Sequence, residues 1–440
     1  MSAMAPLWRG MASLLPREVS EHATTNSQLR AQWVSPSDVL SVLLLLGPDI
    51  VKKAVAAQAG RRITPVAFSF GWVAYAATAV LDVLGAGSFM PPADVEGVLV
   101  VGADTGHSRT SSNWVLGRLL RDLTNQFDQE MQSEESHVPP STDDNKKDTS
   151  NEKATFETPQ STFSNQSQLS ARPTDQSETS RTKPWEALRV SVFTVAKDSN
   201  LEHGVPALDL VWYSGIFIVI VQLALSIIPW SLYGEWHVFL IAVFGNILAI
   251  TEGSIPQIRE EKWACPRRGG ATVAITQGNG SRHVILIEND RKSKNGLDLE
   301  ILARSTRAIR PALFTKVATA ILALLWVVLL ITVAGMENHA WFLLTIGIIG
   351  SAQNLYVAGA SRSPASHGIH MDFKHTIVDK SVHKVLKRVE QDYPLMGLVL
   401  LDVFYPNSLR VKTEEDKAFW RAALANKMKP NHHGDWVYNL

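Results

Sequence analysis

Four long apolar stretches constrain the fold of this chain of 440 residues more than any other feature. A helix needs roughly 20 mostly apolar residues to cross about 30 Å of bilayer hydrocarbon. A helix in a soluble core keeps one polar face, and the first and third stretches have none. The sequence therefore predicts a mainly α-helical, multi-pass membrane protein with spans at 208–228, 236–252, 314–334 and 341–360.

The four spans pair into two transmembrane hairpins, 208–252 and 313–360, each joined by a turn too short to hold a domain. Neither turn contains Lys or Arg, whereas the segment 253–312 and the tail 361–440 contain many. Because basic residues stay on the cytosolic side of a membrane, we expect this segment and the C-terminus to be cytosolic. The glycosylation sequons at Asn165 and Asn279 would then be cytosolic and unused.

The N-terminal hydrophobic region, 36–87, allows two interpretations. Residues 65–84 are nearly long enough to span, which favours a fifth membrane helix packed on the bundle, whereas 39–46 are too short to cross alone. A single crossing would place four basic residues outside, against the positive-inside rule: Lys52, Lys53, Arg61 and Arg62. The alternative is an interfacial or re-entrant pair, which leaves the N-terminus cytosolic.

Two polar segments are expected to be disordered. Residues 1–35 form a leader without the continuous apolar core of a signal peptide. Residues 128–183 form a linker rich in Ser and Thr, which holds too few apolar side chains to offset the entropy of ordering.

The remaining pieces predict a small mixed α/β lobe in the cytosol. Residues 88–127 contain a strand (95–101) and a helix (113–123) that Ser111 or Ser112 would cap. A β-hairpin is predicted from two apolar runs around a glycine-rich turn. The segments that complete the lobe are the hairpin strands 272–276 and 284–288, the tail helices 382–391 and 414–425, and the apolar run 395–404.

The chain contains the stretches 33–50, 63–75, Gly106-His-Ser-Arg, 113–122, Glu261-Lys-Trp-Ala-Cys and Thr276-Gln-Gly-Asn-Gly-Ser-Arg-His. Together they resemble a group of integral membrane proteins of filamentous ascomycete fungi, and the likeness covers both ends and the membrane core but leaves out the linker. The group has no assigned activity, so the resemblance implies a fungal membrane location and no particular chemistry. Members that lie beside secondary-metabolite genes imply an accessory role at most.

Two clusters outside the spans are candidate sites. Backbone N–H groups where a strand passes into a helix can hold an anion, which makes Gly102, Gly106, Ser108 and Arg109 candidates. No P-loop pattern is present, and ordinary turn chemistry explains the same composition. A metal could be bound by His367, His370 and His375, with Asp372 between them, but their spacing matches no zinc-hydrolase pattern. We therefore expect no metal and no cofactor.

Polar residues inside spans are costly and therefore informative. They would line a path in a transporter, or form hydrogen bonds between helices in a protein that only packs. We favour packing, because the spans contain no Arg or His away from their ends. The residues are Gln222, Asn246, Glu252, Gln353 and Asn354.

The composition narrows the function further. Forty-two basic and 42 acidic residues balance, which gives no electrostatic reason to expect nucleic acid as a partner. The single cysteine, Cys265, excludes an intramolecular disulfide. No catalytic set is recognisable. We expect a non-enzymatic scaffold or regulatory component whose partners are the bilayer and either a second copy or another membrane protein; the alternative is a small-molecule transporter or exporter, or an accessory protein of a secondary-metabolite pathway.

Overall fold

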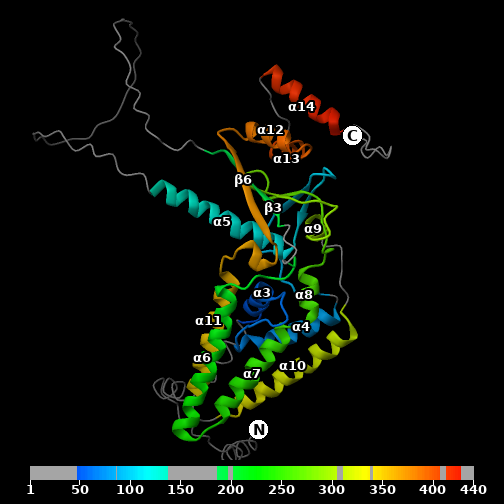
Figure 1. Cartoon of the computed structure of the whole chain (residues 1–440). Helices are drawn as coiled ribbons and strands as arrows, with labels where there is room; N and C mark the ends of the chain where they lie inside the picture. Colours follow the sequence, from blue (N-terminus) through cyan, green and yellow to red (C-terminus); the bar gives the residue numbers. More distant parts are fainter. Residues whose placement is uncertain are drawn as a thin grey trace, which may run out of the picture.

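A computed structural model of the chain describes residues 47–85, 87–136, 186–196, 202–304, 311–336, 340–406 and 413–427. These residues form a bundle of helices with a six-stranded sheet at one end (Figure 1). The predicted leader, Asn165 and most of the predicted linker lie outside the described residues.

Three helices of the bundle are each long and apolar enough to span a membrane: α6 (Leu210–Tyr233), α10 (Leu313–Ala334) and α11 (Ala340–Gly359). The predicted second span is α7 (His237–Gly253), which meets the same test only together with α8 (Pro256–Lys262), across a bend of 41°. Large apolar side chains on these helices are exposed, as expected of a surface that faces lipid; they include Phe217, Ile220, Leu232, Phe314, Leu324 and Ile331. The chain therefore has the helices of a membrane-embedded protein.

Both ends of α6 have a local cause. Asp209 caps the helix, since its side chain accepts a hydrogen bond from the N–H of Trp212 at 2.9 Å. The helix passes through Pro229 and ends at Gly234, whose φ of 73° favours glycine. The predicted end at 228 is therefore five residues early, and the turn to α7 is shorter than expected.

The N-terminal region does not form the predicted helix over 65–84. Residues 48–58 are helical (α3, Pro48–Gln58), the chain is then non-helical through residue 70, and α4 (Gly71–Leu84) has 14 residues. At 1.5 Å per residue, α4 is roughly 21 Å long and too short to span by itself. The prediction of one spanning helix is wrong at its first six residues.

Residues 64–70 descend into the interior of the bundle. Phe68 lies against Gly245 at the middle of α7 and against Gly350 at the middle of α11. The chain then returns along α4, and the N–H of Phe89 donates to Glu261 of α8 near the sheet. Residues 64–70 thus enter the bundle and the chain turns back within it, and we refer to them as the re-entrant segment. The other half of the predicted pair, 39–46, lies outside the described residues.

The sheet has the strand order β2-β1-β4-β5-β3-β6, and only β3 and β5 run parallel among its neighbouring strands. The predicted hairpin is confirmed, because β4 and β5 pair antiparallel. Three strands have no counterpart in the prediction: β2 forms one edge of the sheet, and β3 and β6 extend it to the other. The strands are β1 (Val98–Gly102), β2 (Ser108–Ser111), β3 (Leu188–Val195), β4 (Val273–Thr276), β5 (His283–Glu288) and β6 (Met371–Asp379).

Both faces of the sheet are covered, so the first five consecutive residues of β5 are all buried. Ile285 and Ile287 face the core shared with α5 (Trp114–Ser136), and Val284 and Leu286 face the opposite core. That second core is completed by tail helices close to the predicted positions: α12 (Val382–Asp392), α13 (Met396–Phe404) and α14 (Glu414–Lys427).

Helix α5 corrects two predictions. It continues to Ser136, so the first nine residues of the predicted linker are helical. Its cap is Asn113 rather than Ser111 or Ser112, because the Asn113 side chain accepts from the N–H groups of Val115 and Leu116.

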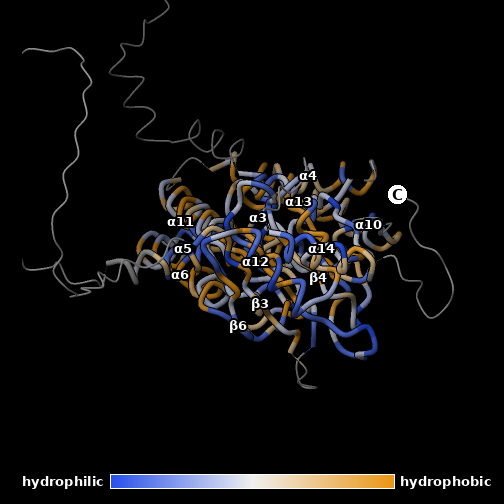
Figure 2. The backbone as a smooth tube through the Cα atoms, turned by 90° about the horizontal axis from the view of Figure 1, so that it is seen from above, coloured by the Kyte–Doolittle hydropathy of each residue, from blue (hydrophilic) through white to orange (hydrophobic). Residues whose placement is uncertain are grey.

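One hydrophobic core runs from the bundle into the sheet. It contains Phe68 and Trp326 in the bundle, Leu119 on α5 and Ile285 on β5 without interruption. Helix α5 crosses the junction between the two parts (Figure 1). Seen from above, hydrophilic segments of the lobe overlie the hydrophobic helices α6, α10 and α11 (Figure 2). The lobe and the bundle therefore fold as one unit.

Candidate functional site

Residues 64–70 lie in the bundle without a helix or a strand to pair their backbone, although every one of them is buried. An unpaired backbone group in a bilayer costs several kcal/mol, so non-helical chain at this depth is tolerated only inside protein. The bonds that satisfy this backbone define the candidate site.

Side-chain amides from three helices of the bundle, α6, α7 and α11, bond the backbone at residues 67 and 68. The N–H of Phe68 donates to Oδ1 of Asn246 at 3.2 Å, and the carbonyl of Phe68 accepts from Nε2 of Gln222 at 2.8 Å. The carbonyl of Ala67 accepts from Nδ2 of Asn354 at 3.2 Å. Three of the five intramembrane polar residues singled out from the sequence therefore meet on two consecutive residues of one segment.

The other two lie apart from these amides. Gln353 donates to the hydroxyl of Ser214 at 2.8 Å and so joins α11 to α6. Glu252, fully buried near the end of α7, accepts from the indole Nε1 of Trp326 at 2.6 Å. Its second oxygen has no hydrogen-bond partner among the described residues.

Glycines let the segment approach the helices closely. A Cβ at Gly350 of α11 would overlap the carbonyl oxygen of Phe68, and one at Gly215 of α6 would overlap that of Pro65. Trp326 stacks against Phe68 and against Trp72, with ring centroids 6.0 Å apart in each case. The segment is thus enclosed by packing as well as by hydrogen bonds.

A second polar group lies where the bundle meets the lobe, and Arg362 is its centre. The guanidinium forms a bidentate pair with Asp209, both distances being 2.7 Å, and donates to the carbonyl of Ala57 at 2.6 Å. The backbone N–H of Arg362 donates to the carboxylate of Asp122 on α5 at 3.1 Å. Burial raises the pKa of Asp209, but the bond to Arg362 outweighs it and holds that pKa below its ordinary value. Arg362 thereby fastens α3, α5 and α6 together.

Further cations of this junction hold the C-terminal ends of helices, where carbonyl groups lack partners within the helix. Arg118 pairs with Asp94 and donates to the carbonyl of Ala360 at 3.0 Å, just beyond α11. Lys262 donates to the carbonyls of Ala56 and Ala59 at 2.9 and 2.6 Å, at the end of α3. Each cation joins elements that are far apart in the sequence.

The histidines proposed as metal ligands have other partners. His367 is fully buried in a short 3-10 helix (Pro364–His367), with its Nε2 2.9 Å from Asp122. Burial lowers its pKa to about 4, against the effect of Asp122, so the ring is neutral at pH 7. The Nε2 of His370 lies 3.0 Å from the carbonyl of Val205, and His375 is on β6. No group of three or more metal-ligating side chains occurs in the ranges described.

The proposed anion loop is not at a helix N-terminus. Residues 102–108 connect β1 to β2, an antiparallel hairpin, and α5 begins only after it. Glu300 lies at this turn: it accepts from the hydroxyl of Thr105 at 3.2 Å and is 3.9 Å from Arg109. An internal carboxylate is therefore already next to the candidate arginine.

Sequence reasoning missed the junction. The pairs Arg362–Asp209 and Arg362–Asp122 join residues 153 and 240 positions apart, and neither forms a motif. The available signal is charge placement, because these side chains lie just beyond the ends of apolar stretches. Comparisons with protein-family models, with curated proteins and with solved structures found no match for this chain.

Proposed function

We propose that this protein is a non-enzymatic membrane scaffold whose lobe is held rigidly on the bundle and forms a fixed platform on the cytosolic side. The observation that carries this proposal is the continuous core from Trp326 to Ile285, closed at the junction by the buried ion pairs of Arg362 and Arg118. Breaking such a buried pair costs about 3–5 kcal/mol, which resists any motion of the lobe against the spans.

The re-entrant segment supports the same role. Transporters expose polar groups along a path and move one part of the bundle against another. Here the amides of Gln222, Asn246 and Asn354 are bonded to the backbone of residues 67 and 68. They serve assembly of the bundle, and the surface that remains for partners is that of the lobe and of the lipid-facing helices.

Distance measurements between spin labels test the rigidity. Labels at Leu324→Cys on α10 and Lys384→Cys on α12, both exposed, report the position of the lobe relative to the bundle. The buried Cys265 is replaced by alanine beforehand. In nanodiscs we expect a single narrow distance, which broadens when Arg362→Gln is added.

A pair inside the lobe, Asn279→Cys with Lys384→Cys, is the control and should stay narrow in both backgrounds. Two resolved distances between bundle and lobe with Arg362 intact would contradict a fixed platform.

The cytosolic orientation rests on the basic residues of the segment between the hairpins and of the tail. Single cysteines at Asn279 in the lobe and at Ser231 near the far turn, both exposed, test it in the Cys265→Ala background. In sealed vesicles that keep the cytosolic face inside, an impermeant maleimide should label the Ser231 variant only. Labelling of Asn279 alone would reverse the orientation.

Glu252 favours transport as a second candidate function, because an acid buried in a span with one oxygen unpaired is typical of proton pathways. Proton uptake by proteoliposomes under a potassium diffusion potential separates the two. A flux that is lost in Glu252→Gln and kept in the exposed control Glu260→Gln would favour the transporter. Equal leak in all three proteins is the result expected of a scaffold.

A further inference from the structure

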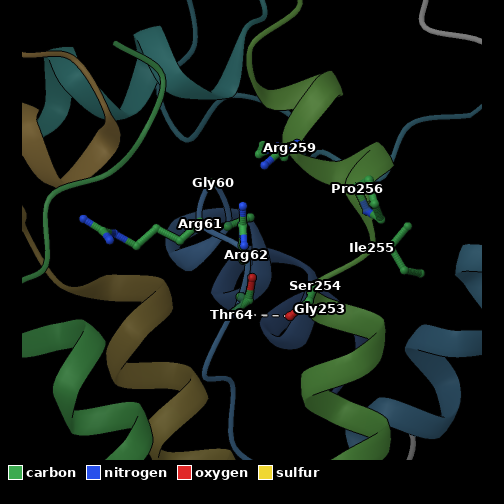
Figure 3. Close-up of a pocket in the computed structure, with 10 residues that line it drawn as sticks. Gly60, Arg61, Arg62, Thr64, Gly253, Ser254, Ile255, Pro256 and Arg259 are labelled. Atoms are coloured by element: carbon green, nitrogen blue, oxygen red, sulfur yellow. Dashed lines mark hydrogen bonds between the residues drawn. The ribbon is translucent and has the colours of Figure 1, made fainter. Parts of the chain in front are cut away.

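A half-open cavity of about 240 Å³ lies at the end of the bundle next to the sheet, where the apolar part of α7 ends. Two distant segments form its walls: the turn 59–64 after α3 and the break 253–256 between α7 and α8 (Figure 3). A hydrogen bond of 3.0 Å from the N–H of Thr64 to the hydroxyl of Ser254 joins these walls.

The lining of the cavity is strongly basic. It includes Arg61, Arg62 and Arg259, and none of its ten residues is acidic. Arg61 is turned away from the cavity (Figure 3) and its Nε donates to the carbonyl of Pro206 at 2.8 Å. Arg62 from the turn and Arg259 from α8 remain as the two cations that face the space.

These two guanidinium groups differ from the other arginines near the bundle. Arg118, Arg121 and Arg362 are each bound to a carboxylate and to a carbonyl group. For Arg62 and Arg259 the structure gives no hydrogen bond and no ion pair within the described part of the chain. Each guanidinium carries five N–H donors, so the cavity has positive charge and donors without a counter-ion.

We propose that this cavity binds a phosphate group between Arg62 and Arg259. The planar fork of arginine matches two phosphate oxygens, which makes it the preferred residue for this anion. The Ser254 hydroxyl accepts from Thr64 and keeps its own hydrogen free to donate. The site goes beyond the scaffold role proposed above and does not depend on it.

The size and depth of the cavity indicate what carries the phosphate. Its volume of about 240 Å³ exceeds the need of a bare phosphate and leaves room for a substituent. In a bundle embedded in a membrane, the end of an apolar helix such as α7 is expected near the lipid headgroups. A phospholipid headgroup is therefore the first source of the phosphate, and a soluble phosphate compound is the second.

Binding of short-chain lipids to the full-length protein in detergent tests the proposal. Dioctanoyl phosphatidic acid supplies the phosphate, dioctanoylglycerol lacks it, and inorganic phosphate represents the soluble source. We expect phosphatidic acid to bind and dioctanoylglycerol not to bind, with at least a tenfold loss of affinity in the double variant Arg62→Gln/Arg259→Gln. The single variant Arg62→Glu should lose more than Arg62→Gln, because it adds repulsion.

A control with the same change in charge is Arg268→Gln/Lys316→Gln, two exposed cations that do not line the cavity. It should bind phosphatidic acid as the unaltered protein does. Unfolding midpoints without ligand show whether each variant is folded; if the double variant is not, the two variants of the exposed Arg62 carry the test.

The outcomes separate the sources. If inorganic phosphate binds as tightly as phosphatidic acid and is lost in the same variants, the phosphate site stands and its ligand is soluble. Equal binding of phosphatidic acid by the cavity variants and by the unaltered protein would overturn the site, and so would equal binding of dioctanoylglycerol and phosphatidic acid.

Discussion

The side-chain Nε2 of Gln222 lies 2.8 Å from the carbonyl oxygen of Phe68, in the interior of the helical bundle. The same nitrogen is 2.9 Å from the carbonyl of Ile346 on α11. One amide on α6 therefore connects the re-entrant segment to two spanning helices.

Replacing Gln222 with methionine keeps the length of the side chain and removes both donors. The carbonyl of Phe68 then loses its partner on α6, and we expect the free energy of unfolding to fall by about 1–3 kcal/mol. Thermal unfolding in detergent, followed by tryptophan fluorescence, measures the change. The control is Ile220→Met on the exposed face of the same helix, and a loss of the same size there would contradict the role of the amide.

Gly350→Ala should destabilise the bundle more than Gln222→Met does. The added Cβ would overlap the carbonyl oxygen of Phe68, which is backbone and cannot rotate away. Gly359 lies on the same helix with no atom within 4 Å of its Cβ position, so Gly359→Ala is a matched control. Size-exclusion chromatography and unfolding midpoints should show a folded control and a loss of at least about 3 kcal/mol for Gly350→Ala.

The free energy of unfolding should decrease as the pH is lowered, because of His367. Its pKa is lowered by burial to about 4 in the folded chain, against about 6.5 in an unfolded one, so the unfolded state binds more protons between these values. This contribution is intact above about pH 6.5 and is lost as the pH falls toward 4, by an amount on the order of 3 kcal/mol. Burial alone would raise the pKa of its partner Asp122, but the bond to His367 holds that pKa below its ordinary value, so Asp122 adds to the loss only at lower pH.

Unfolding midpoints measured from pH 7 to pH 4.5 give the slope of stability against pH. The variant His367→Gln should flatten it, while His375→Gln on β6 should leave it as it is. An identical slope in all three proteins would assign the acid sensitivity to other groups.

The pair of Arg362 and Asp209 should behave as one unit. Arg362→Met alone leaves the Asp209 carboxylate without its cation and should cost about 3–5 kcal/mol. In the Arg362→Met background, Asp209→Asn should cost far less than it does in the unaltered protein. The expected coupling energy is about 1–3 kcal/mol. A double-mutant cycle on unfolding free energies measures this, and additive losses would show that the two side chains act separately.

The sequence predicts the spanning helices well because lipid requires each of them to satisfy its own backbone. An apolar stretch of this length therefore predicts both that the segment is in the membrane and that it is helical. The β4–β5 hairpin is also local, since Gly278 and Gly280 adopt the positive φ values that its turn requires.

Residues 65–70 show where this reasoning fails. Pro-Val-Ala-Phe-Ser-Phe is as apolar as a span, and its non-helical form depends on amides at positions 222, 246 and 354. Nothing within the segment encodes those contacts. The sequence does not predict strand β6 for a related reason. It is an edge strand with mostly exposed and half-buried residues, and it lacks the alternation of a typical strand.

The sequence identifies the polar residues of the candidate site, but it does not identify the groups that they bond. Gln222, Asn246 and Asn354 were identified because amides are costly in lipid, and packing between helices was the expected use. The structure gives all three a non-helical chain as partner, and Gln222 in addition bonds a second helix at the carbonyl of Ile346. Charged residues such as Arg362 resemble surface residues in the sequence until the fold brings Asp209 to them.

The re-entrant segment also affects the order in which the protein is made. Synthesis delivers residues 64–70 to the membrane before α6, α7 and α11 exist, and these helices carry every amide that satisfies the backbone of Ala67 and Phe68. The segment cannot take its final place until the later helices have been inserted. A segment that leaves the ribosome before these three helices is thus among the last parts of the bundle to settle, and a chain truncated before α11 would expose this backbone to lipid.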